Sequence, residues 1–191
     1  MMKKPFSIKN QTGFTLIEMV LVILAIGIIG TMAAAMLGQG ADIYKETVYR
    51  QSFLSQARST FWRMSREGGL QRNSDNFNLS GPINFYAINA KNETVQFAFS
   101  GLSGLNYTAT SGTTYPLSNQ LNPNSSRIRY FNESLGEISL STGQTLTETR
   151  ADSVRLLYLD ISFKQDDDSV RFSSFIYPQN FRFGKKMSYH D

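Results

Sequence analysis

The chain has 191 residues, of which 41% are hydrophobic and 18% are charged, and its formal net charge is +4. Three of its 19 basic residues, Lys3, Lys4 and Lys9, lie in the first 13 residues, which leaves 16 basic against 15 acidic residues in the rest of the chain. This near-neutral balance argues against a strongly cationic nucleic-acid binder, and the lack of cysteine excludes a disulfide framework.

The first 13 residues form a basic segment without an apolar core of its own. A secretory signal needs an apolar segment followed by a small-residue cleavage site, whereas here the hydrophobic run begins only after Gly13. The positive-inside bias predicts that the lysine-bearing end stays in the cytoplasm and that the bulk of the chain is exported.

From Phe14 to Leu37 the chain has 24 residues, and Glu18 is the only charged one among them. At about 1.5 Å of helix rise per residue this run is roughly 36 Å long, enough to cross a bilayer with some tilt. Its small residues are Ala25, Gly27, Gly30, Ala33 and Ala34. Small side chains let a neighbouring helix approach closely, so the span is expected to associate as well as to anchor.

A basic leader that ends in glycine, followed by Phe14-Thr15-Leu16-Ile17-Glu18 at the start of a long apolar run, resembles the type IV pilin superfamily of pilins and pseudopilins. The resemblance implies that a prepilin peptidase cleaves between Gly13 and Phe14, that the new Phe14 amine is N-methylated, and that Glu18 is the assembly carboxylate. The implied partners are other pilin or pseudopilin subunits and an inner-membrane assembly platform. The implied location is the inner membrane of a Gram-negative bacterium, single-pass with a cytoplasmic N-terminus, and then a pilus or pseudopilus. No cofactor is implied, and nucleic acid is not an expected partner.

Glu18 admits a second, purely local interpretation. Thr15-Leu16-Ile17-Glu18 matches the S/T-x-x-E capping box, in which the glutamate closes the start of its own helix. A charge inside a membrane span is costly, on the order of 3 kcal/mol in insertion experiments, and is read as functional by default. The two roles are compatible, because a freed Phe14 ammonium on an adjacent subunit would be a natural ionic partner for a carboxylate at a helix N-terminus.

Gly38-Gln39-Gly40 interrupts the apolar run, after which helical periodicity resumes from about residue 41 to residue 67. Its apolar stripe consists of Leu54, Ala57, Phe61 and Met64, preceded by Tyr44 and Val48. This stripe is expected to pack on the chain's own sheet, and Gly68-Gly69 is expected to end the helix. The arginines of this segment are Arg50, Arg58, Arg63 and Arg66. We interpret them as a solvated face; the alternative is a contact with acidic patches of neighbouring subunits in a filament.

From Leu70 onward, the composition predicts β-structure with long loops. The candidate strands are residues 83–88, 94–100, 127–131, 137–140, 154–163 and 170–177. Residues 101–126 are rich in Gly, Ser, Thr and Asn and are predicted to form an exposed loop region, and residues 165–168 a hairpin turn.

The predicted fold is α+β, with a long N-terminal helix packed on a C-terminal antiparallel sheet, and the pilin resemblance implies the same fold. Four segments are expected. They are a leader (1–13), a transmembrane assembly helix (14–37), its amphipathic continuation (38–69) and an exported β-sheet domain (70–191).

Catalysis has little support, so the chain is not expected to be an enzyme. The only histidine, His190, lies next to the C-terminus, and without cysteine or a second histidine a nucleophilic triad has little to build on. Asp166, Asp167 and Asp168 could ligate calcium, because hard cations take clustered oxygens. A solvated turn is favoured, since their spacing matches no defined calcium loop.

Two classes of function remain open. The first is a structural subunit of a type IV pilus or of a type II secretion pseudopilus. Residues 63–67 and 175–180 resemble minor pilins, which implies a minor subunit, and the mannose-sensitive haemagglutinin type is the suggested subfamily. The second is a binding module on a pilin stem, an adhesin or a DNA receptor, that uses residues 101–126 or the aromatic side chains of Tyr107 and Tyr115.

Overall fold

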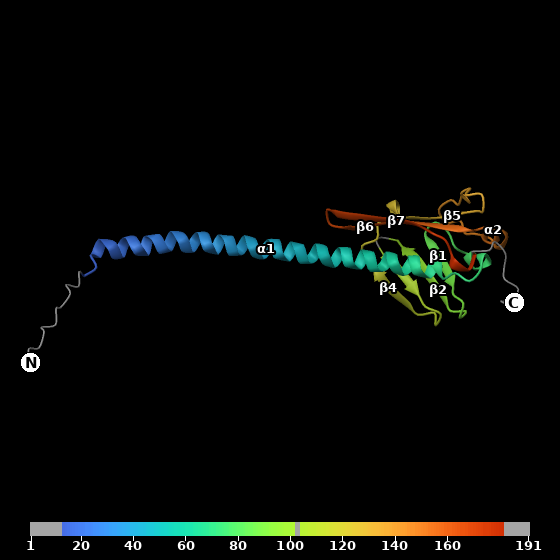
Figure 1. Ribbon diagram of the computed structural model, residues 1–191, viewed down its shortest axis with the longest axis horizontal. Helices are drawn as coiled ribbons and strands as arrows, with labels where there is room; N and C mark the ends of the chain where they lie inside the picture. The colour runs from blue at the N-terminus through green and yellow to red at the C-terminus, as the bar shows by residue number, and fades with distance from the viewer. Residues whose placement is uncertain (1–12, 102–103, 182–191) are drawn as a thin grey trace, which may run out of the picture. The chain divides into compact units, whose positions relative to one another are not determined.

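The computed structural model describes residues 13–101 and 104–181 (Figure 1). The chain divides into two compact units, Met1–Arg50 and Gln51–Asp191. The expectations for the leader residues before Gly13 and for His190 lie outside the described residues. Helix α1 (Leu16–Gly69) begins in the first unit and ends in the second, so the two units are taken in turn.

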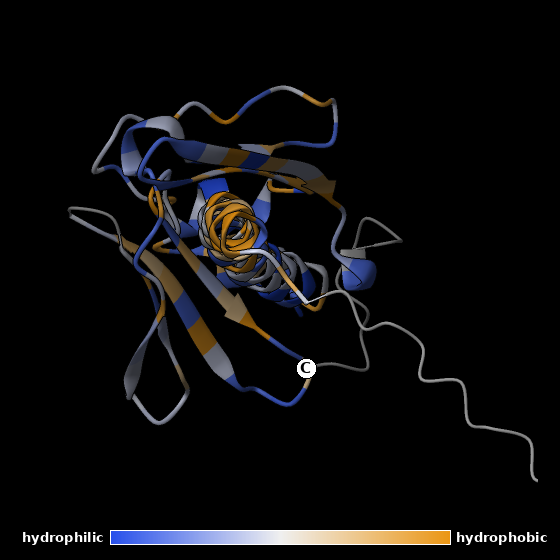
Figure 2. Cartoon of the chain, turned by 90° about the vertical axis from the view of Figure 1, so that its left-hand side faces the viewer, coloured by the Kyte–Doolittle hydropathy of each residue, from blue (hydrophilic) through white to orange (hydrophobic). Residues whose placement is uncertain are grey.

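The described part of the first unit consists of the N-terminal part of α1 and the three residues before it. Gly38 and Gly40 interrupt the apolar run but not the helix, because one glycine costs only about 1 kcal/mol relative to alanine. Every described side chain of this unit is exposed. By length and composition α1 could cross a membrane, and Figure 2 shows the start of the helix, seen end-on, as mainly hydrophobic.

The second unit contains two antiparallel sheets, with strand orders β1-β2-β3-β4 and β5-β6-β7. The first sheet comprises β1 (Asn84–Ile88), β2 (Thr94–Ser100), β3 (Gly104–Thr108) and β4 (Thr114–Ser118). The second comprises β5 (Arg127–Phe131), β6 (Leu156–Gln165) and β7 (Asp168–Ile176). The short helices are η1 (Ser74–Phe77), η2 (Pro123–Ser125), α2 (Glu148–Asp152) and η3 (Gln179–Phe181).

The α+β class is confirmed, and five of the six predicted strands match a strand. The strand predicted at residues 137–140 is wrong: after one bridge between Phe131 and Glu137 the chain leaves the sheet edge. The loop predicted at residues 101–126 is also wrong, because β3 and β4 extend the first sheet there. Although the segment is polar in composition, Leu105 is fully buried.

The last turns of α1 pack between the two sheets, where the prediction had a single sheet. On one side Thr60 Oγ1 donates to the carbonyl of Leu117 in β4 at 3.5 Å. On the other side the rings of Phe61 and Phe172 (β7) lie 5.5 Å apart. Gly68 lies between the sheets, where an added Cβ would be 2.9 Å from Leu157 and 3.5 Å from Phe85. A side chain at position 68 would therefore require the Leu157 side chain to move.

The predicted apolar stripe is partly correct. Ala57, Phe61 and Met64 are buried, but Phe53 begins the stripe and Leu54 is 41% exposed. Because each helical residue turns the side chain by about 100°, this difference of one residue moves the buried face by more than a quarter turn at that end. Tyr44 and Val48 belong to the first unit and are exposed, so they are not part of the core. The helix ends at Gly69, as predicted.

A carboxylate buried on β6 is held by two arginines. Asp160 is 4% exposed and accepts hydrogen bonds from Arg171 Nε at 2.6 Å and Nη2 at 2.5 Å, with Arg129 Nη2 at 3.6 Å. The hydrogen bonds from Arg171 hold the pKa of the Asp160 carboxyl below its ordinary value of 3.8. The folded state therefore favours the ionised carboxylate.

Replacing Asp160 by asparagine is expected to lower the free energy of unfolding by about 1–3 kcal/mol at neutral pH, because the charge-assisted bonds to Arg171 are lost. Since the folded-state pKa is the lower one, this contribution is present above pH 3.8 and disappears as the pH falls through the lowered value. Urea unfolding of the full chain in detergent, followed by near-ultraviolet circular dichroism, measures both effects. Asp167→Asn, on an exposed turn, is the control, and an equal loss of stability in both variants would contradict the assignment.

Candidate functional site

The start of α1 is closed by a reciprocal capping box. The backbone N–H and the hydroxyl of Thr15 both donate to Glu18 Oε2 at 2.9 Å, and Glu18 N–H donates to Thr15 Oγ1 at 3.4 Å. The local interpretation of the Thr15–Glu18 motif is confirmed, since these bonds satisfy donors that a helix start leaves unpaired.

The cap uses only one oxygen of the carboxylate. Both bonds from Thr15 end on Oε2, and within the described part of the chain no bond is made to Glu18 Oε1. The side chain is exposed, so the second oxygen is open to a donor from another molecule. Capping therefore does not exclude a second role for the same carboxylate.

Gly13 and Phe14 lie directly before the cap. A Cβ added to Gly13 would meet nothing within 4 Å, so the fold of the described residues gives no reason for glycine at this position. Phe14 is 76% exposed and Leu16 is 83% exposed. The chain thus presents this junction openly, as a processing enzyme would require, and the structure itself adds no contact that defines a cleavage point.

The apolar surface that follows is uncovered. Large hydrophobic side chains from Leu16 to Leu37 are exposed throughout, and added Cβ atoms at Gly27 and Gly30 would meet nothing within 4 Å. A continuous apolar surface of this size marks a membrane or protein contact. The first unit therefore requires lipid or other subunits to cover it.

The remaining candidates do not join this site. Asp166 and Asp167 form the two-residue turn between β6 and β7, as predicted. Among the described residues there is no group of three or more histidine, cysteine or acidic side chains that could hold a metal ion. Tyr107 packs against Phe97 at 5.4 Å, whereas Tyr115 is 51% exposed on β4.

Comparison with known families matches residues 8–34 to the prokaryotic N-terminal methylation motif. Curated proteins and solved structures gave no match. The matched stretch contains the glycine junction, the capping box and most of the apolar run. A methylation motif of this kind suggests assembly with other pilin subunits and processing by a prepilin peptidase. The chain therefore carries a type IV pilin signal at residues 8–34, ahead of an α+β fold that is consistent with pilin-like proteins, and the motif points to a structural subunit and not to an enzyme.

Proposed function

We propose that this chain is a minor structural subunit of a type IV pilus. The observation that carries the proposal is the methylation motif at residues 8–34, placed at the start of a capped helix whose apolar surface is uncovered. A helix of this kind is suited first to anchoring in lipid and then to packing against other helices of the same type.

In this proposal the prepilin peptidase removes residues 1–13 and the Phe14 amine is N-methylated. The lysines of the leader keep the N-terminus in the cytoplasm, so the chain is held as a single span in the inner membrane of a Gram-negative cell. An inner-membrane platform then transfers it into the fibre. The open surroundings of Gly13 support this route, since no contact within the described residues obstructs the junction.

Glu18 supplies the difference between the membrane-held and the assembled states. Its Oε2 is occupied by the cap, and its Oε1 is available for the Phe14 ammonium of an adjacent subunit. A buried charge without a partner is costly, whereas a paired one is much less so. Pairing across subunits therefore favours the fibre over the isolated span.

Two alternatives use the same N-terminal motif. A minor pseudopilin of a type II secretion system would be processed and anchored identically. A pilin-stemmed adhesin or DNA-binding module would use the β3–β4 hairpin, where Tyr115 is exposed. Neighbouring genes distinguish a type IV pilus subunit from a pseudopilin, because pilus-retraction genes accompany a pilus and general-secretion genes accompany a pseudopilus. The mannose-sensitive haemagglutinin type is our proposed subtype.

The protein is expected to be a low-abundance component of the fibre. Its span lacks the proline that many major pilins carry there, and its exported domain has no cysteine. Quantitative proteomics of sheared fibres tests this, with the peptide that begins at Phe14 as the marker of the mature chain. If it is the predominant component, the subunit is major and not minor; if it is confined to the inner membrane of piliated cells, the pilus assignment fails.

A further inference from the structure

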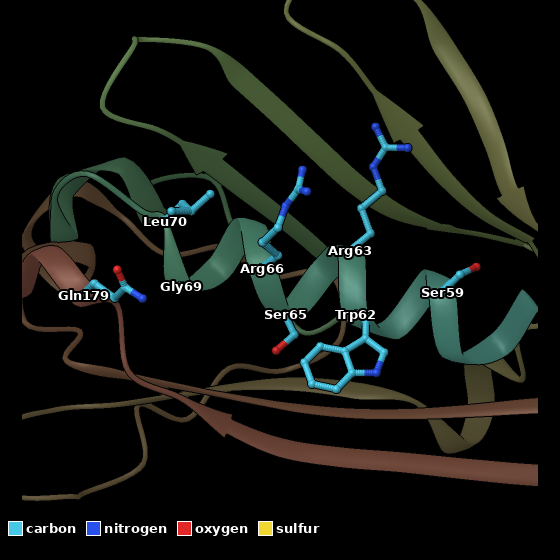
Figure 3. Close-up of a pocket in the computed structure, with 8 residues that line it drawn as sticks. All are labelled: Ser59, Trp62, Arg63, Ser65, Arg66, Gly69, Leu70 and Gln179. Atoms are coloured by element: carbon cyan, nitrogen blue, oxygen red, sulfur yellow. The ribbon is translucent and has the colours of Figure 1, made fainter. Parts of the chain in front are cut away.

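An open groove runs along the side of α1 that the two sheets leave uncovered in the second unit. Its lining includes Trp62, Arg63, Ser65, Arg66, Leu70 and Gln179. Figure 3 shows the two arginines extending along one flank of the helix, with Trp62 and Ser65 along the other. Trp62, the one tryptophan of the chain, is 64% exposed. This exposure is unusual, because tryptophan side chains are highly buried on average.

The groove offers hydrogen-bond donors. Arg63 lies over the ring of Tyr107, 3.9 Å from its centroid, and Arg66 Nη2 donates to Glu67 at 3.1 Å. These contacts orient both guanidinium groups, each of which has five N–H donors. The exposed indole of Trp62 adds an N–H that is only a donor. Arginine and tryptophan are the residue types that dominate binding energy at protein interfaces, and here they suit an acidic segment.

An acidic segment of this kind lies at the other end of the same unit. The β6–β7 turn exposes Asp166 and Asp167. Strand β7 runs in the direction of α1, because Phe172 lies beside Phe61 and Ile176 beside Gly68. Figure 1 shows the turn and η3, which contains Gln179, at opposite ends of this unit.

We propose that the groove of one subunit binds the β6–β7 turn of a second copy of this chain. The two surfaces are different patches with opposite charge, so the contact is head-to-tail, and a contact of this kind can repeat along an axis as an open filament. This inference rests on the proposed function, since the fibre supplies that axis. It requires copies of the subunit to be adjacent in the fibre, even where they are few.

Charge also argues against the nearest alternative occupant, the chain's own C-terminal residues. Residues 182–191 contain Arg182, Lys185 and Lys186 against a single acidic residue. Like charges at close range are unfavourable, whereas the aspartates of the turn match the arginines of the groove. The second copy is therefore the occupant that the charges favour.

Cross-linking in the fibre tests the contact. Because the chain has no cysteine, Ser65→Cys in the groove and Lys164→Cys beside the turn introduce unique thiols and keep all three aspartates. Cells that co-express the two full-length single variants are treated with a short bismaleimide. The expected result is a linked dimer in sheared fibres of these cells, absent from cells that express either variant alone.

Charge reversal then tests its chemistry. Adding Arg66→Glu to the Ser65→Cys chain is expected to lower the dimer yield about fivefold, and adding Asp167→Lys to the Lys164→Cys chain is expected to restore it. Arg58→Glu, on an exposed position of α1 outside the groove, is the control and is expected to leave the yield unchanged.

Three outcomes would overturn the inference. Fibres that contain both variants without a linked dimer would refute the contact and leave the proposed function intact. A groove thiol that links instead to a different subunit would refute the second copy as occupant. Variants that are processed but never reach the fibre fraction would refute the proposed function, and the inference would fall with it.

Discussion

Replacing Glu18 by glutamine is expected to leave the protein cleaved and stable in the inner membrane but to lower its recruitment into fibres about a hundredfold. Glutamine retains an oxygen that can accept both hydrogen bonds of Thr15, so the cap survives. The Phe14 ammonium of the neighbouring subunit loses its ionic partner where water is excluded, at a cost of about 3 kcal/mol or more. Membrane insertion survives as well, since the span becomes more apolar.

The measurement is the amount of variant that co-purifies with partner pilins, divided by the total amount in the membrane. Thr15→Ala is the matched control, because it removes the capping hydroxyl and keeps the carboxylate. Loss of a cap costs about 1 kcal/mol, so recruitment of this variant is expected to fall far less. If Glu18→Gln is recruited at the unmodified level, only the capping role remains.

Replacing Gly13 by valine is expected to abolish processing and to leave the full-length form in the inner membrane. Nothing in the described chain lies within 4 Å of a Cβ at this position, so the substitution does not disturb the fold. It changes only what the peptidase meets at the junction. Mass spectrometry of the membrane fraction detects the retained leader directly.

Gly38→Ala provides the control for this experiment, since a Cβ there also meets nothing within 4 Å and lies far along the chain from the junction. Its processing is expected to be unchanged. A mature N-terminus at any residue other than Phe14 in the unmodified protein would refute the predicted cleavage point.

Local patterns carried most of the correct predictions. The capping box depends on residues three apart, and both of its halves are visible in the sequence at Thr15 and Glu18. The same holds for β1, β2 and the β6–β7 turn, whose alternation and turn residues are read within a few positions. Such features depend little on what the rest of the chain does.

The errors arose where distant segments decide burial. Leu105 is buried because β3 pairs with β2 and lies in the core, which a polar local composition does not reveal. Thr60 is buried beside Phe61, and Glu67 beside Gly68, because sheets on two sides of α1 widen its buried face. A helix face that packs on one sheet is narrower than a face that packs between two sheets. The predicted stripe begins at Leu54, whereas the buried face begins at Phe53.

The exposed groove could not be predicted from the sequence for the same reason. A tryptophan in an amphipathic helix is ordinarily predicted to be a core residue. Trp62 lies outside the core because neither sheet covers its side of α1. The sequence shows the arginine face of the helix. For the oppositely charged residues 166–168, however, it predicts only a solvated turn. Their placement at opposite ends of one unit depends on the direction in which β7 runs along α1.

The position of β7 also sets the order in which the second unit can fold. Phe61 and Gly68 pack against Phe172 and Ile176, residues more than a hundred positions further along the chain. Contacts of such long sequence separation form late, since a large loop must close first. The residues of α1 that contact β7 therefore stay uncovered until β7 has folded onto them. A chain cut before β7 would leave the face of Phe61 uncovered, and exposed hydrophobic surface of this kind favours aggregation.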